Sequence, residues 1–112
     1  MRHVEIDLGN KTRRLKFTYN SVCDIEEKAK AGIAALLTEE KIGFNTMRLL
    51  VWGGMKWENR GLTVEVVGNL IEEYIENGGS MVDLMGSVAE ALEKCKVVGA
   101  KSEGKNQTEA AI

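Results

Sequence analysis

The chain has 112 residues, of which 44% are hydrophobic and 29% charged, with a net charge of −2. This length and composition predict one folded domain of modest stability, and the slightly acidic balance argues against a nucleic-acid binder. No apolar run is long enough to span a membrane. Acidic residues at the N-terminus, where a signal peptide needs an apolar core, indicate a cytosolic protein. Cys23 and Cys95 are therefore expected to be reduced core residues and not a disulfide.

A β-hairpin is predicted over residues 3–17. Apolar and acidic residues alternate along its first strand, which is the period of a half-buried strand. Gly9-Asn10 is a two-residue turn signal, and a loop there sets the register that pairs Val4 with Leu15. Since an isolated hairpin is marginal in water, this one must lie on helices.

The second strand carries a cluster of positive charge. A nucleic-acid site would need several aromatic residues among these charges for base stacking, and only Phe17 is near. Charged edge strands are common because they discourage pairing with other chains, and we prefer that interpretation. The residues are Lys11, Arg13, Arg14 and Lys16.

Helices follow the hairpin. Asn20 or Ser21 is expected to cap the first helix, and Gly32 to end it. The pair Gly53-Gly54 is expected to stop the second helix. The predicted helices cover about 20–31, 45–53, 63–77 and 80–97, with caps at Thr63 and Ser80 and a short helical turn around 33–37.

Apolar residues at helical spacing predict which faces are inward. The expected inward residues are Val22, Ile25 and Ala29 in the first helix, Val64, Val67, Ile71, Tyr74 and Ile75 in the third, and Met81, Leu84, Met85, Val88, Leu92 and Cys95 in the fourth. The sequence thus predicts an α+β, mainly α domain over 1–98, with an N-terminal β-hairpin packed on a bundle of about four helices. Residues 99–112 lack apolar periodicity and are expected to be a flexible tail.

Nothing in the sequence indicates catalysis, a metal site or a cofactor. His3 is the only histidine, and the two cysteines are far apart in the chain. The glycine pairs are not followed by the Lys-Ser or Lys-Thr of a phosphate-binding loop. We therefore expect a non-enzymatic protein without cofactors.

Both tryptophans fall in the corner between the second and third helices. Trp52 continues an apolar helix face and is expected in the core, whereas Trp57 lies past the glycines between charged residues and is expected to be partly exposed. We therefore expect loss of the Trp57 ring to weaken partner binding and leave the fold intact. The candidate partner-binding residues are Phe44, Met47, Met55 and Trp57, with plain core packing as the alternative.

The chain also resembles a known family. The phrases IDLGNKTRRLKFTYN, RLLVWGGMKW and LTVEVVGNLIEEYI, in this order with an acidic helix after the first, look like the tail assembly chaperones of long-tailed (siphovirus-type) phages and prophages of Gram-positive bacteria. The resemblance runs from about Val4 to Cys95. It departs from the family at Val64, where proline is expected, and at Met55, where leucine is more usual. The matching positions are Ile6, Gly9, Lys11, Leu15, Phe17, Tyr19 and Asn20, then Leu49, Leu50, Trp52, Gly53 and Trp57, and finally Leu62, Thr63, Val66 and Val67.

This resemblance implies a function. It implies a short-form chaperone that binds the tape measure protein, helps recruit tail tube subunits, and has possible self-association. Such a protein acts in the host bacterial cytoplasm and is absent from the mature virion. A phage structural part, such as a head–tail connector or tail completion protein, and a small prophage regulator are the alternatives.

The resemblance also implies a longer form made by ribosomal frameshifting near the end of the reading frame. Gly104-Lys105-Asn106 can be encoded as GGA-AAA-AAY, which contains a heptamer suited to a backward slip. We expect this heptamer in the gene, and reading the codons tests it. If the codon for Gly104 is not GGA, or the codon for Lys105 is AAG, this slip site is excluded.

Overall fold

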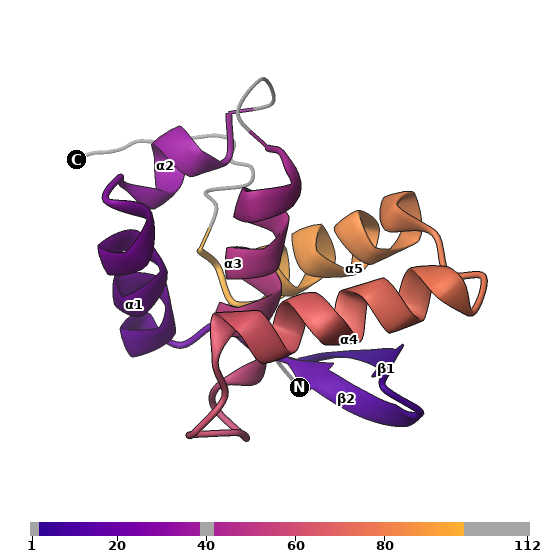
Figure 1. Cartoon of the computed structure of the whole chain (residues 1–112). Helices are drawn as coiled ribbons and strands as arrows, with labels where there is room; N and C mark the ends of the chain where they lie inside the picture. The colour runs from indigo at the N-terminus through magenta and orange to yellow at the C-terminus, as the bar shows by residue number, and fades with distance from the viewer. Residues whose placement is uncertain (1–2, 39–41, 98–112) are drawn as a thin grey trace.

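The computed structural model describes residues 3–38 and 42–97, which form an N-terminal hairpin and five helices (Figure 1). The predicted α+β, mainly α class is confirmed, whereas the tail predicted over 99–112 lies outside the described residues. The elements are β1 (Val4–Leu8), β2 (Lys11–Leu15), α1 (Tyr19–Ala29), α2 (Ile33–Leu36), α3 (Phe44–Met55), α4 (Val64–Glu76) and α5 (Met81–Lys94).

The hairpin has the predicted register. Val4 pairs with Leu15 and Leu8 with Lys11 in an antiparallel ladder. Gly9 and Asn10 both have a φ of 64°, the left-handed conformation that a tight two-residue turn requires. The apolar residues of β1 are buried against α4 and α5, so the hairpin closes one side of the helical core.

Helix α3 is the centre of the molecule. It contacts α1, α4, α5 and β2, with α1 and α2 on one side and α4 and α5 on the other (Figure 1). Val51 and Met55 are fully buried, and Leu50 is 1% exposed. An α-helix that is apolar on nearly all sides is covered on nearly all sides, which explains why α1, β2, α4 and α5 all pack on α3.

Gly53 and Gly54 do not stop α3, contrary to the prediction. Both lie inside the helix, which ends at Met55. A Cβ on Gly53 would lie 2.3 Å from Cδ1 of Ile25 in α1, and a Cβ on Gly54 would lie 2.9 Å from Cδ2 of Leu15 in β2. The missing side chains let α1 and β2 approach the α3 backbone. The main-chain N–H of Lys16 then donates to the Gly54 carbonyl at 2.9 Å.

The boundaries of α1 also differ from the prediction. Thr18, and neither Asn20 nor Ser21, caps the helix: its Oγ1 accepts from the Ser21 N–H at 3.1 Å. At the other end Lys30 takes the left-handed conformation, with a φ of 58°, and ends the helix two residues before Gly32. Lysine can occupy this position because a single residue in this region costs only about 1–2 kcal/mol.

The later caps are as predicted. The side chains of Thr63 and Ser80 accept main-chain N–H bonds in the first turns of α4 and α5. Cys23 and Cys95 form no disulfide with each other, as expected, but Cys23 is exposed and Cys95 half-buried, so the expectation that both lie in the core was wrong for Cys23. None of the described helices has the length and apolarity needed to cross a membrane.

Alanine substitutions in two helices test the close packing of α3. Alanine favours helix over glycine by about 1 kcal/mol, yet Gly53→Ala should destabilise the fold by about 1–3 kcal/mol because its methyl group overlaps Ile25. Gly86 in α5 has open space around it, so Gly86→Ala should stabilise by about 0.5–1 kcal/mol. Urea unfolding measures both, and equal effects at the two positions would contradict the packing.

Candidate partner-binding groove

An apolar groove lies where the start of α3 meets the end of α4 and the start of α5. It consists of two adjoining hollows of about 660 Å³ and about 410 Å³, which share Phe44, Met47 and Met81. We call it the α3–α5 groove. The first hollow is also lined by Asn45, Arg48, Gly68, Ile71, Glu72, Ile75 and Glu76, and the second by Ile42, Gly43, Val82 and Met85.

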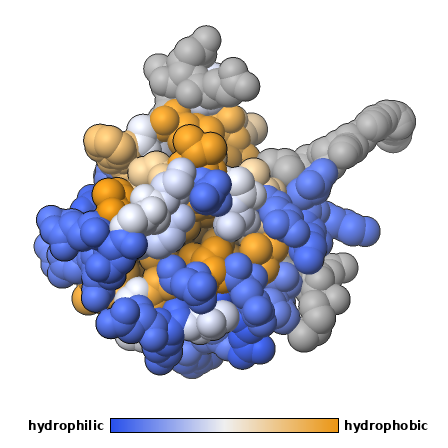
Figure 2. All heavy atoms as spheres, turned by 90° about the vertical axis from the view of Figure 1, so that its right-hand side faces the viewer, coloured by the Kyte–Doolittle hydropathy of each residue, from blue (hydrophilic) through white to orange (hydrophobic). Residues whose placement is uncertain are grey.

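Large apolar side chains of this groove are open to solvent. Phe44 is 85% exposed, Val82 79% and Ile75 45%. The face of the molecule that holds the end of α4 and the start of α5 shows hydrophobic side chains gathered in its upper part, with hydrophilic ones beside and below them (Figure 2). Exposed apolar surface bordered by polar residues is typical of a surface that another molecule covers.

The four candidate partner-binding residues separate into two groups. Phe44 and Met47 both line the groove, with Met47 buried at its floor. Met55 is fully buried at the other end of α3, about 16 Å from Phe44 along the helix axis. The prediction of an exposed apolar corner was therefore wrong for Met55, because the hairpin and α1 cover the end of α3 where it lies, and for Met47, which is only 2% exposed.

Trp57 is partly exposed, as predicted, but it packs on the hairpin and not in the groove. Its Nε1 donates to the carbonyl of Arg14 at 3.0 Å. The Arg14 guanidinium and the Lys16 ammonium lie 5.2 and 4.9 Å from its ring centroid, close enough for cation–π attraction. Glu58 forms an ion pair with Arg14 beside it. Trp57 therefore ties the end of α3 to β2.

Trp52 is buried, as predicted. Only 5% of its surface is exposed, and its Nε1 donates to the Leu62 carbonyl at 3.0 Å, so the indole is satisfied inside the fold. The ammonium groups of Lys28 and Lys56 lie over its ring at 5.3 and 5.0 Å. Trp52 thus bonds to Leu62, beyond the turn that follows α3, and Trp57 in that turn bonds to β2.

Sequence reasoning missed most of the groove. Ile75, Met81 and Met85 were assigned to inward helix faces, but Ile75 is 45% exposed and the two methionines are only half-buried. They sit at the end of α4 and the start of α5, where the covering elements no longer reach. Val82 carried a usable signal, since it is a large apolar residue outside the inward stripe of α5.

The lining of the groove is mainly apolar. Its polar side chains are Asn45, Arg48, Glu72 and Glu76, and the remaining lining is apolar or glycine. Among residues 3–38 and 42–97, no three His, Cys, Asp or Glu side chains come together as a possible metal site. A long apolar surface with a few charges at its border suits an amphipathic helix laid into it.

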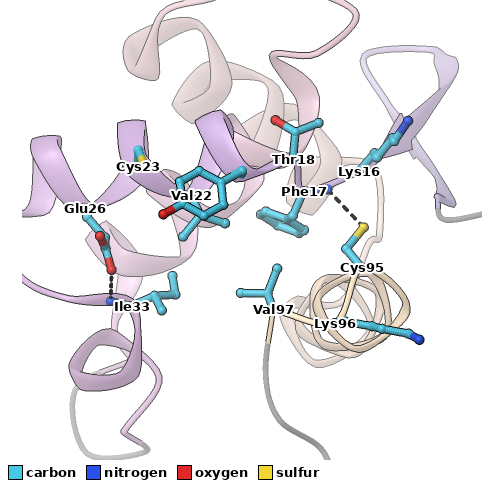
Figure 3. Close-up of a pocket in the computed structure, with 11 residues that line it drawn as sticks. Lys16, Phe17, Thr18, Val22, Cys23, Glu26, Ile33, Cys95, Lys96 and Val97 are labelled. Carbon is cyan, nitrogen blue, oxygen red and sulfur yellow. Dashed lines mark hydrogen bonds between the residues drawn. The ribbon is translucent and has the colours of Figure 1, made fainter.

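A further hollow of about 580 Å³ lies between the start of α1 and the end of α5 (Figure 3). Two of its polar side chains, Glu26 and Cys95, have structural partners. The Phe17 N–H donates to Cys95 Sγ at 3.2 Å, and Glu26 accepts from the Ile33 N–H at 2.6 Å, which caps α2. Val97, the last described residue, also lines it. We prefer the α3–α5 groove because three large apolar side chains around it are exposed, Phe44, Val82 and Ile75, whereas Tyr19 is the one large exposed side chain of this kind on the described lining of the further hollow.

Comparison of the chain with known protein families, curated proteins and solved structures found no match. The functional assignment therefore depends on the geometry of the chain itself and on the resemblance described above.

The two tryptophans should differ in their contribution to stability. Trp52→Ala should cost about 3–5 kcal/mol, because it opens a large cavity in the core. Trp57→Ala should cost about 1–2 kcal/mol, because it removes one hydrogen bond and exposed cation–π contacts. This replaces the expectation that the fold would be unaffected. Trp57→Phe keeps an aromatic face for the cations but lacks the N–H donor, so it should recover part of the loss. An unchanged urea midpoint for Trp57→Ala would contradict the anchoring role.

Proposed function

We propose that this chain is a non-enzymatic binding protein whose α3–α5 groove holds an apolar helical segment of another protein. The observation that carries the proposal is the exposure of Phe44, Val82 and Ile75 around one groove. A small-molecule site normally encloses its ligand and buries most of its own lining. A groove that leaves whole aromatic and branched side chains in water suits a larger partner that covers them.

Within this class, we propose the role of a phage tail assembly chaperone of the short form, acting in the host cytoplasm. Its partners would be the tape measure protein and, during tail morphogenesis, the tail tube subunits. The support is the resemblance of the hairpin and helix phrases together with the groove. A long, apolar, helical tape measure would aggregate before the tube encloses it. Many copies of a small acidic domain would keep it in solution by mass action.

Genomic context and particle composition give the first test. The reading frame of a tape measure protein, very long and helical, should lie just downstream of the gene for this chain. Mass spectrometry of purified particles should not find the chain. Its presence in the particles would favour a connector or tail completion protein, and a gene neighbourhood without tail genes would favour a regulator.

Surface substitutions test the groove itself. Phe44→Ser/Val82→Ser should leave stability within about 0.5 kcal/mol, because both side chains are largely exposed. On co-expression, wild type should keep the neighbouring tape measure protein in the soluble fraction, and this variant should not. The matched control is Tyr19→Ser/Val66→Ser, which removes an exposed aromatic and an exposed valine outside the groove.

The control variant should behave as wild type. If the groove variant also holds the tape measure protein in solution, the partner binds elsewhere. If wild type fails to do so, the chaperone role is wrong.

A further inference from the structure

Two acidic residues line the α3–α5 groove along α4. Glu72 and Glu76 are both exposed and lie one turn apart, next to the apolar Ile71 and Ile75. Among the residues that the structure describes, neither carboxylate has an ion-pair or hydrogen-bond partner. They give the apolar groove a negatively charged border along α4.

Their placement is unfavourable for the isolated chain. Like charges four residues apart repel each other on a helix, and α4 contains no lysine or arginine to compensate. The C-terminal end of a helix also carries partial negative charge, which disfavours acids in the last turns. These costs would be offset by a positively charged partner in the groove.

The opposite end of the first hollow is positive. Arg48 lies beside Gly68 of α4, with its Cδ 3.3 Å from the point that a Gly68 Cβ would occupy. Its Nη2 donates to Asn45 Oδ1 at 2.9 Å, whereas its Nε is buried without a hydrogen-bond partner. Arg48 lines the first hollow, so its guanidinium gives this end of the groove a positive charge.

The two ends of the groove therefore carry opposite charge. From Gly68 to Glu76 it follows α4 for about 12 Å, or roughly two helical turns, with Arg48 at one end and Glu72 and Glu76 toward the other. A bound helix would bring a partly positive N-terminus and a partly negative C-terminus. Only one direction places both ends next to opposite charge.

We infer that the occupant is an amphipathic helix of the partner protein that runs antiparallel to α4. Its N-terminal half carries lysine or arginine facing Glu72 and Glu76, and its C-terminal half carries a carboxylate or free carbonyls facing Arg48. Its apolar face covers Phe44, Ile75 and Val82. This inference rests on the proposed function of the groove and adds the direction and charge pattern of the bound segment.

Two synthetic peptides test the direction. Both are capped amphipathic helices with the same composition and the same apolar face. The first has lysines in its N-terminal half and glutamates in its C-terminal half. The second has the glutamates in its N-terminal half and the lysines in its C-terminal half. Fluorescence anisotropy at low salt should show that wild type binds the first about fivefold to tenfold more tightly, as expected for a few exposed ion pairs. The preference should shrink at high salt.

Charge-reversal variants separate the groove from the peptides' own helicity. Glu72→Lys/Glu76→Lys should reverse the preference, because the same peptides now meet positive charge at that end. The control Glu65→Lys/Glu73→Lys changes the net charge equally on the same helix, at residues that do not line the groove. It should keep the wild-type preference.

The possible failures are distinct. If wild type binds both peptides equally and Phe44→Ser/Val82→Ser binds neither, the inferred antiparallel direction is wrong, and the proposed function of the groove stands. Binding of neither peptide to wild type overturns both. Self-association of the chain that the same groove variant abolishes would show that a second copy, and not a partner helix, covers the groove.

Discussion

The close approach of α1 and β2 to the α3 backbone is the constraint on which the rest of the fold depends. Gly53 and Gly54 leave room for Ile25 on one side and Leu15 on the other, and the Lys16 N–H bonds directly to the carbonyl of Gly54. A small domain has little apolar surface to bury. Contact at backbone distance lets the hairpin and α1 share one helix as their common core, and it fixes the end of α3 from which Trp57 reaches back to β2.

This arrangement explains why the groove lies at the other end of α3. The hairpin, α1 and the Trp57 contacts all cover the region around Gly53, so the apolar residues there, Met55 among them, are buried. At Phe44 no comparable layer is formed by the described residues, and the end of α4 and the start of α5 leave Ile75 and Val82 open to solvent. The described part of the molecule thus has a closed end, where the core is covered, and an open end, where we place the proposed binding groove.

The charges follow the same division. At the closed end, acids and bases are paired with each other: Arg14 with Glu58, and Lys56 with Asp24. At the open end, Glu72 and Glu76 are separated from the Arg48 guanidinium, and no ion pair joins them. Pairing satisfies the charges within the chain, whereas separation leaves a field along the groove that can orient a charged partner.

The sequence by itself determined the elements that local rules govern. Alternation and the Gly9-Asn10 turn gave the hairpin and its register, Thr63 and Ser80 marked two helix starts, and apolar spacing placed Trp52 in the core. The sequence pointed to Phe44, but the role of Gly53-Gly54 and the exposure of Ile75 and Val82 beside Phe44 became visible in the folded chain. A glycine pair reads as a helix break until a neighbouring chain is seen to need the space. An apolar residue at helical spacing is likewise predicted to be core, although the element that would cover it can end before reaching it. Both outcomes depend on contacts between segments far apart in the sequence.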